Sequence, residues 1–131
     1  MISLRETKPG KGPCEKEDLE FEIQFFEGVL KRDKAFIEAL QILGDAYTKT
    51  GQWEKGLKVD KRLARLCPDN PLVFYNLACS YSVMSRLDAA FAALNKAVKL
   101  GYTDAKWLTH DPDLENLRKD SRFEVIKRGL Q

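Results

Sequence analysis

The chain has little cysteine, little histidine and almost no net charge, and each shortage excludes a class of protein. Three of its 131 residues are cysteine and one is histidine. Cys14, Cys67 and Cys79 form an odd set without the spacing of a disulfide framework, so we expect reduced thiols and a cytoplasmic protein. With 22 basic and 20 acidic residues the net charge is +2, which gives no general attraction to nucleic acid or to an anionic membrane.

Long apolar runs and recognisable reaction centres are also missing. No segment approaches the roughly 20 apolar residues that span a bilayer, and residues 1–18 lack the apolar core of a secretory signal. The cysteines and His110 lack the short paired spacing of a zinc site. No nucleophile motif, phosphate-binding glycine loop or acidic pair accompanies His110. We therefore expect no metal, no cofactor, no enzymatic activity, and neither a membrane nor a nucleic-acid partner.

What remains has the composition of a soluble globular protein, with 44% hydrophobic and 32% charged residues. Residues 1–16 contain two prolines and two glycines among charges, which predicts a flexible N-terminal tail. A single domain is expected from 17 to 131. No alternating pattern of a β-strand interrupts it.

Apolar residues three and four positions apart predict a series of helices in this domain. The first is a lone helix at 17–33. The second runs from about 35 to 50 and ends at Gly51, where a left-handed residue closes a helix well. The third covers 53–67 and stops there because Pro68 cannot continue it.

Two further helices follow. Asn70 before Pro71 is a capping residue followed by a proline in the first turn, the usual start of a helix. Ser85, with Asp88 three residues later, resembles the capping box of a fifth helix, which Gly101 ends. The fifth helix is apolar on nearly every side, so we expect it to be buried between neighbours.

A repeat of 34 residues identifies the class of fold. Residues 37–70 and 71–104 carry large, small and aromatic residues at matching places. The matching pairs are Leu40 and Phe74, Leu43 and Leu77, Gly44 and Ala78, Tyr47 and Tyr81, and Gly56 and Ala90. This pattern resembles the tetratricopeptide repeat (TPR) family. The resemblance implies an all-α fold, a right-handed α-solenoid of helix hairpins that must stack because no hairpin buries its apolar face alone.

Residues 105–131 predict a helical C-terminal cap. They resemble the TPR end-of-group segment that closes bacterial repeat arrays, a likeness covering Phe74 to about Val125. Short helices are expected to start at Asp111 and at Asp120 or Ser121. The residues expected to cover the fifth helix are Trp107, Leu108, Leu114, Leu117, Phe123 and Val125. Those expected to face water are Arg118, Lys119, Arg122, Lys127 and Arg128.

The TPR resemblance also implies a site, a concave groove lined by the first helix of each hairpin. We therefore expect a non-catalytic interaction module that binds a peptide or protein partner there. The first hairpin contributes Glu38, Gln41, Asp45, Thr48 and Lys49, and the second contributes Leu72, Tyr75, Cys79, Ser82 and Val83. For Leu72, Tyr75 and Val83 the alternative is that they only pack against the cap. Both interpretations stay open at this point.

The resemblance does not extend to the carboxylate clamp by which some TPR co-chaperones hold an acidic tail. The five clamp positions fall on Gln41, Asp45, Asn76, Lys106 and His110, and only Asn76 and Lys106 match. Asp45 would oppose a bound carboxylate. We therefore expect no such clamp.

Two other helix surfaces each allow two interpretations. Lys55, Lys58, Arg62 and Arg65 recur at spacings of three and four on the third helix, and we interpret them as a solvated face in preference to a site for phosphates or an acidic partner. The lone first helix has Phe21 and Phe25 on a face without a partner helix. That face favours a rival function, self-association into a homodimer or a larger assembly.

Overall fold

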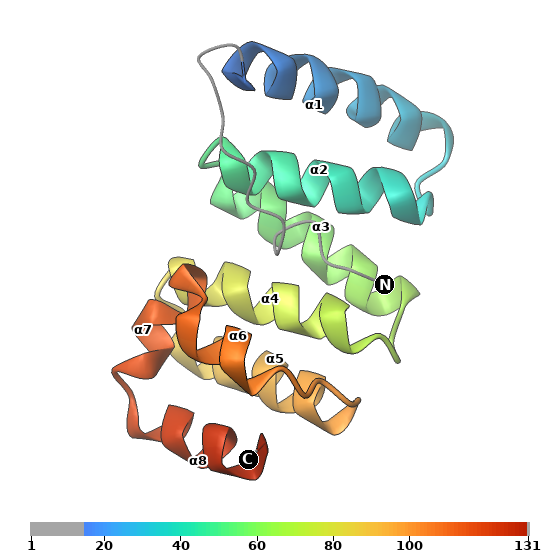
Figure 1. Cartoon of the computed structure of the whole chain (residues 1–131). Helices are drawn as coiled ribbons and strands as arrows, with labels where there is room; N and C mark the ends of the chain where they lie inside the picture. The colour runs from blue at the N-terminus through green and yellow to red at the C-terminus, as the bar shows by residue number, and fades with distance from the viewer. Residues whose placement is uncertain (1–14, 131) are drawn as a thin grey trace. The chain divides into compact units, whose positions relative to one another are not determined.

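The computed structural model describes residues 15–130, and all regular structure in that range is helical. The elements in chain order are α1 (Glu15–Arg32), α2 (Ile37–Lys49), α3 (Trp53–Leu66), α4 (Pro71–Val83), α5 (Leu87–Lys99), α6 (Ala105–His110), the 3-10 turn η2 (Pro112–Leu114), α7 (Glu115–Arg118) and α8 (Ser121–Leu130) (Figure 1). The predicted all-α class is confirmed. Most of the predicted tail lies outside the described residues, but α1 begins at Glu15 and so takes in its last two positions.

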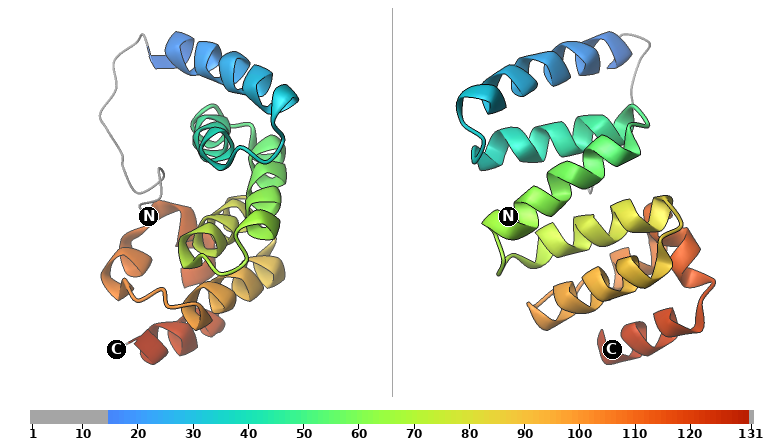
Figure 2. Two further views of the ribbon diagram at one scale, coloured as in Figure 1. Left: turned by 90° about the vertical axis from the view of Figure 1, so that its right-hand side faces the viewer. Right: turned by 180° about the vertical axis from the view of Figure 1, so that it is seen from behind.

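The chain divides into two compact units, Met1–Pro68 and Asp69–Gln131. In unit 1, α2 packs against both α1 and α3 (Figure 2). In unit 2, α4 and α5 pair as a hairpin, and η2, α7 and α8 pack against it. The division falls two residues before the boundary between the predicted repeats, 37–70 and 71–104.

The helix ends confirm most of the local predictions. Gly51 and Gly101 have positive φ angles of 74° and 114° and follow the ends of α2 and α5. The Asn70 side chain accepts a hydrogen bond of 2.9 Å from the backbone N–H of Leu72, and Pro71 opens α4.

The prediction of a capping box at Ser85 is wrong. Ser85 has a φ of 58°, and its N–H donates to the carbonyl of Ser82 at 2.9 Å, so it closes α4 and does not open α5. The N-cap of α5 is Arg86, which makes no capping hydrogen bond with its side chain. The physical reason is that a two-helix hairpin needs a left-handed residue after its first helix, and Ser85 occupies the place that Gly51 holds in unit 1.

In unit 1 the core lies on the inner faces of three helices. The buried residues include Ile23 and Leu30 from α1, Leu40, Leu43 and Tyr47 from α2, and Leu57, Val59 and Leu63 from α3. Asp60 is also buried and lies against Gly44 of α2, where a Cβ atom would come within 3.4 Å of the Asp60 Oδ1. The α2–α3 interface therefore holds a buried carboxylate.

In unit 2 the cap covers the second hairpin largely as predicted. Leu108, Leu114, Leu117 and Phe123 are buried together with Phe91 and Leu94 of α5. The prediction that Val125 covers α5 is wrong, because Val125 is 70% exposed and Ile126 is buried in its place. Ile126 lies three positions after Phe123 and shares its helix face, whereas Val125 lies two positions after it and faces away.

The prediction that α5 is apolar on nearly every side is also wrong. Asp88, Ala92, Asn95, Lys96 and Lys99 are exposed. Their spacing of three and four puts them along one side of the helix, so α5 has an ordinary solvated strip opposite its buried face.

The two glycines at the α2–α3 interface make a matched stability test. A Cβ at Gly44 would lie 3.3 Å from Val59 Cγ1, whereas at Gly56 the nearest atom is Thr48 Oγ1 at 3.6 Å. We expect Gly56→Ala to raise the free energy of unfolding by about 0.5 kcal/mol, because alanine favours the helix and the contact is ordinary. Gly44→Ala is expected to lower it, since Val59 and Asp60 must shift. Urea unfolding followed by circular dichroism measures both, and the reverse order would contradict this account of the interface.

Candidate functional site

The second hairpin's half of the predicted groove is closed by the chain's own C-terminal segment. Tyr75, Cys79 and Ser82 are between 0% and 2% exposed. The Tyr75 ring stacks on Tyr102 with centroids 4.4 Å apart, and the Asn116 side chain donates to the carbonyl of Ser82 at 2.9 Å. These three residues are therefore core residues of unit 2 and offer no surface to a partner. The cap folds back over α4, as the alternative interpretation of Tyr75 had it, while Leu72 and Val83 stay half-buried.

The first hairpin leaves its predicted groove residues more accessible. Glu38 and Lys49 are exposed and Gln41 is half-buried. Lys49 Nζ forms an ion pair of 2.9 Å with Asp45, whose side chain is 11% exposed. Asp45 and Thr48 are less accessible, because Asp45 is buried and the Thr48 hydroxyl donates to the carbonyl of Gly44 and lies toward Gly56 of α3.

Asp111 links the capping segment of unit 2 to α4. This residue is 3% exposed and lies between α6 and η2. Its Oδ2 accepts a hydrogen bond of 2.6 Å from the Tyr75 hydroxyl and one of 3.7 Å from the Cys79 thiol. Its Oδ1 accepts from the backbone N–H of Asp113 at 2.9 Å and so caps η2. One carboxylate therefore joins α4 to the capping segment.

The groups around Asp111 are arranged to suit its negative charge. Burial raises the pKa of Tyr75 far above its usual value, and the neighbouring Cys79 and Asp111 raise it further. The Tyr75 hydroxyl therefore remains a donor. Arg118, which was expected to face water, turns inward and donates to the carbonyls of Asp111 at 2.8 Å and Leu108 at 3.3 Å. The cap is thus fastened by side chains as well as by apolar packing.

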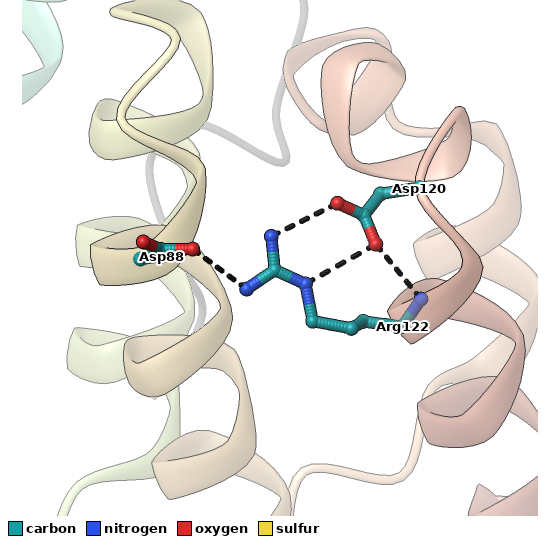
Figure 3. Close-up of polar contacts among 3 residues, drawn as sticks. All are labelled: Asp88, Asp120 and Arg122. Atoms are coloured by element: carbon teal, nitrogen blue, oxygen red, sulfur yellow. Dashed lines mark hydrogen bonds and ion pairs between the residues drawn. The ribbon is translucent and has the colours of Figure 1, made fainter.

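Arg122 makes a second fastening between α8 and α5. Its Nη1 lies 2.8 Å from Asp88, and its Nη2 and Nε donate to Asp120 at 2.9 and 3.1 Å (Figure 3). The guanidinium lies 4.4 Å from the centre of the Phe91 ring. These hydrogen bonds hold the pKa of Asp120 below its usual value. Arg122 is exposed as predicted, like Lys119 and Arg128, but its charged end is bound within the chain.

A group of potential metal ligands was not foreseen in the sequence. Ligand atoms of Cys79, Asp111 and Asp113 lie within 4.8 Å of one another. Both oxygens of Asp111 already accept hydrogen bonds from Tyr75 and Asp113, so a cation would have to displace these contacts. We therefore assign the cluster to the packing of the cap. His110 is exposed at the end of α6, with its Nδ1 2.7 Å from the carbonyl of Lys106.

Unit 1 contains a cavity that the sequence did not predict. It has a volume of about 390 Å³ and is formed by α1, α2, α3 and the turn after α1. Its apolar lining comes from Leu30, Leu40, Leu43 and Val59, all of which are buried core residues. The cavity thus opens onto the hydrophobic core between the three helices.

Five cationic residues surround this apolar lining. They are Lys31 and Lys34 from the end of α1 and the turn after it, and Lys55, Lys58 and Arg62 from α3. Among the described residues that line the cavity, Glu27 is the one acid, and it accepts a hydrogen bond from the Tyr47 hydroxyl. Burial and Glu27 together raise the pKa of Tyr47 above its usual value. Lys55 Nζ lies 5.8 Å from the centre of the Tyr47 ring.

The sequence alone indicated part of the cationic lining of this cavity. Three of the four cations in the predicted stripe line it, and Arg65 does not. Lys31 and Lys34 belong to another helix end, and no spacing rule connects them to α3. We now interpret Lys55, Lys58 and Arg62 as the wall of a cavity, whereas the sequence alone favoured a solvated face.

Comparison with known proteins gives a partial likeness. No family model matches the chain. It is 35% identical over 99 residues to a protein of Arabidopsis thaliana whose name describes it as chloroplastic. The alignment covers 73% of this chain and 28% of that protein, so the chain spans little more than a quarter of the length of the curated relative it matches.

Two capping aspartates test whether the buried carboxylate holds the cap. Asp104 caps α6 through the N–H of Trp107 at 2.9 Å and is exposed, whereas Asp111 caps η2 and also binds Tyr75. We expect Asp104→Ala to cost about 1 kcal/mol of unfolding free energy. Asp111→Ala should cost about 2–4 kcal/mol, because it also leaves the buried Tyr75 hydroxyl without its acceptor. Chemical denaturation measures both, and equal costs would show that Asp111 acts only as a helix cap.

Proposed function

We propose that the chain is a non-catalytic protein-binding module of the TPR type and that its partner contacts unit 1. The 34-residue repeat and the helix hairpins α2–α3 and α4–α5 support the TPR assignment. A right-handed α-solenoid is the arrangement that the repeat favours. The known TPR use of hairpin surfaces for binding makes protein interaction the natural function of such a chain.

The observation that carries the proposal is the uneven distribution of exposed apolar side chains. Among the described residues, seven large apolar side chains are exposed. Six lie in unit 1, and Val125 alone lies in unit 2. The six are Phe21, Phe25, Phe36, Ile37, Trp53 and Leu66. Exposed aromatic and aliphatic groups of this size are favoured at interfaces, where burial in a partner removes them from water.

The closure of unit 2 reduces the number of predicted groove residues that are accessible to a partner. Tyr75, Cys79 and Ser82 bind within the chain itself, so the predicted groove residues proposed to meet a partner are mainly Glu38, Gln41 and the Asp45–Lys49 pair of α2. The exposed apolar groups of unit 1 supply the area that these polar residues lack. The partner surface is therefore proposed to be centred on the first three helices.

The place of action is also a proposal. Cys67 and Cys79 are free, which suits the cytoplasm expected from the sequence and any other reducing compartment. The printed name of the relative adds the chloroplast as a second proposed location. No helix among residues 15–130 is long and apolar enough to cross a membrane.

Partner capture from a lysate of the source cells tests the proposal. We expect Trp53→Ser, which removes an aromatic group that is 40% exposed in unit 1, to reduce capture of a specific protein by about tenfold. Val125→Ser in unit 2 is the matched control and should leave capture unchanged. Quantitative mass spectrometry of the bound fraction measures both. Loss with Val125→Ser alone would move the interface to the cap.

Self-association is a second candidate function, and the exposure of α1 favours it. Phe21 is 72% exposed and Phe25 is 56% exposed, as the rival prediction required. We expect a concentration-dependent homodimer in light scattering that the double variant Phe21→Ser, Phe25→Ser converts to a monomer. A strict monomer at high concentration in the unmodified protein would exclude this candidate and leave binding to another protein in place.

A further inference from the structure

We propose that the cationic cavity of unit 1 binds an acidic peptide segment, with one apolar side chain in the cavity and carboxylates paired with the surrounding lysines. This inference rests on the proposed protein-binding function and names the chemistry of the partner. The site lies apart from the groove residues predicted from the repeat, because Leu40, Leu43 and Tyr47 face α1 and α3, whereas Glu38 and Lys49 do not line the cavity.

The charge around the cavity argues for an anionic ligand. Lys31, Lys34, Lys55, Lys58 and Arg62 contribute five cationic side chains to the lining of one cavity. Glu27 is the single acidic residue among the described lining residues, and its carboxylate accepts a hydrogen bond from the Tyr47 hydroxyl. A concave site with like charges on its walls concentrates the field and attracts the opposite charge. Because the whole chain has a net charge of only +2, this concentration is local.

The apolar lining argues for a ligand that is more than an anion. Leu30, Leu40, Leu43 and Val59 are each 9% exposed or less, so the cavity reaches into the core. A volume of about 390 Å³ accepts a large apolar side chain together with part of its backbone. Burying such a side chain contributes affinity through the area removed from water, and the lysines at the opening retain the flanking carboxylates.

Other occupants fit less well. A phosphate backbone would satisfy the lysines but would leave the leucine and valine lining unfilled. The chain's own first 14 residues carry Arg5, Lys8 and Lys11 against a single acid, Glu6, so their charge has the same sign as the site. An acidic segment with a leucine or phenylalanine among its carboxylates satisfies both halves of the cavity at once.

A labelled peptide tests the inference. The probe is a fluorescein-labelled peptide with a central Leu-Phe pair flanked on each side by glutamates, and fluorescence anisotropy at physiological ionic strength measures its Kd. We expect Lys58→Glu, which reverses a charge lining the cavity, to weaken binding by about tenfold or more. The matched control is Arg65→Glu, a charge reversal on the same helix outside the cavity. It should change the Kd by less than about threefold, because Arg65 does not line the cavity and its exposed charge is partly screened by salt.

Variants of the peptide separate the two halves of the proposal. Replacing Leu-Phe by serines should weaken binding by about tenfold. Unchanged affinity would overturn the apolar part, and equal losses with Lys58→Glu and Arg65→Glu would reduce the effect to general attraction and overturn the site. Binding of a single-stranded oligonucleotide in place of the peptide, with the same dependence on Lys58, would overturn the peptide assignment. No peptide binding, while partner capture still depends on Trp53, would overturn the inference and leave the proposed function standing.

Discussion

The hydrogen bond between Tyr75 and the buried carboxylate of Asp111 is the interaction on which the closure of unit 2 depends. A carboxylate out of water is stable only where donors surround it, and here Tyr75, Cys79 and the N–H of Asp113 converge on it. Because Tyr75 belongs to α4 and Asp111 to the cap, satisfying this one group requires the C-terminal segment to fold back over the helix. The burial of Leu108, Leu114 and Leu117 accompanies the same arrangement.

This closure buries the α4 residues that were predicted to line a groove. Unit 2 uses the aromatic and small residues of α4 within its own core, so Tyr75, Cys79 and Ser82 are covered by the chain itself. Unit 1 has no such segment among the described residues. Its α1 leaves Phe21 and Phe25 in water, and its three helices leave a cavity floored by core leucines. The asymmetry between the units is therefore a consequence of which hairpin the cap covers.

The sequence predicted the regular features well because they depend on nearby residues. Gly51, Asn70 and Gly101 act within one turn of the chain, and all three behave as predicted. Ser85 differs because serine is a common capping residue, yet a shift of 34 residues places it on Gly51, and the repeat register decides its conformation over the local capping pattern. The fold-back of the cap onto Tyr75 joins residues 36 positions apart, and no periodicity in the sequence connects them.

The cavity of unit 1 shows why net charge is a poor guide to the local distribution of charge. The chain has 22 basic and 20 acidic residues, and this balance implies no attraction to anions only if the two kinds of charge are evenly mixed over the surface. The end of α1 and the turn after it bring Lys31 and Lys34 to the same cavity as three cations of α3. Each set alone indicates a solvated helix face or a favourable helix end. Only helix packing brings the two sets together with buried leucines in the lining of one cavity.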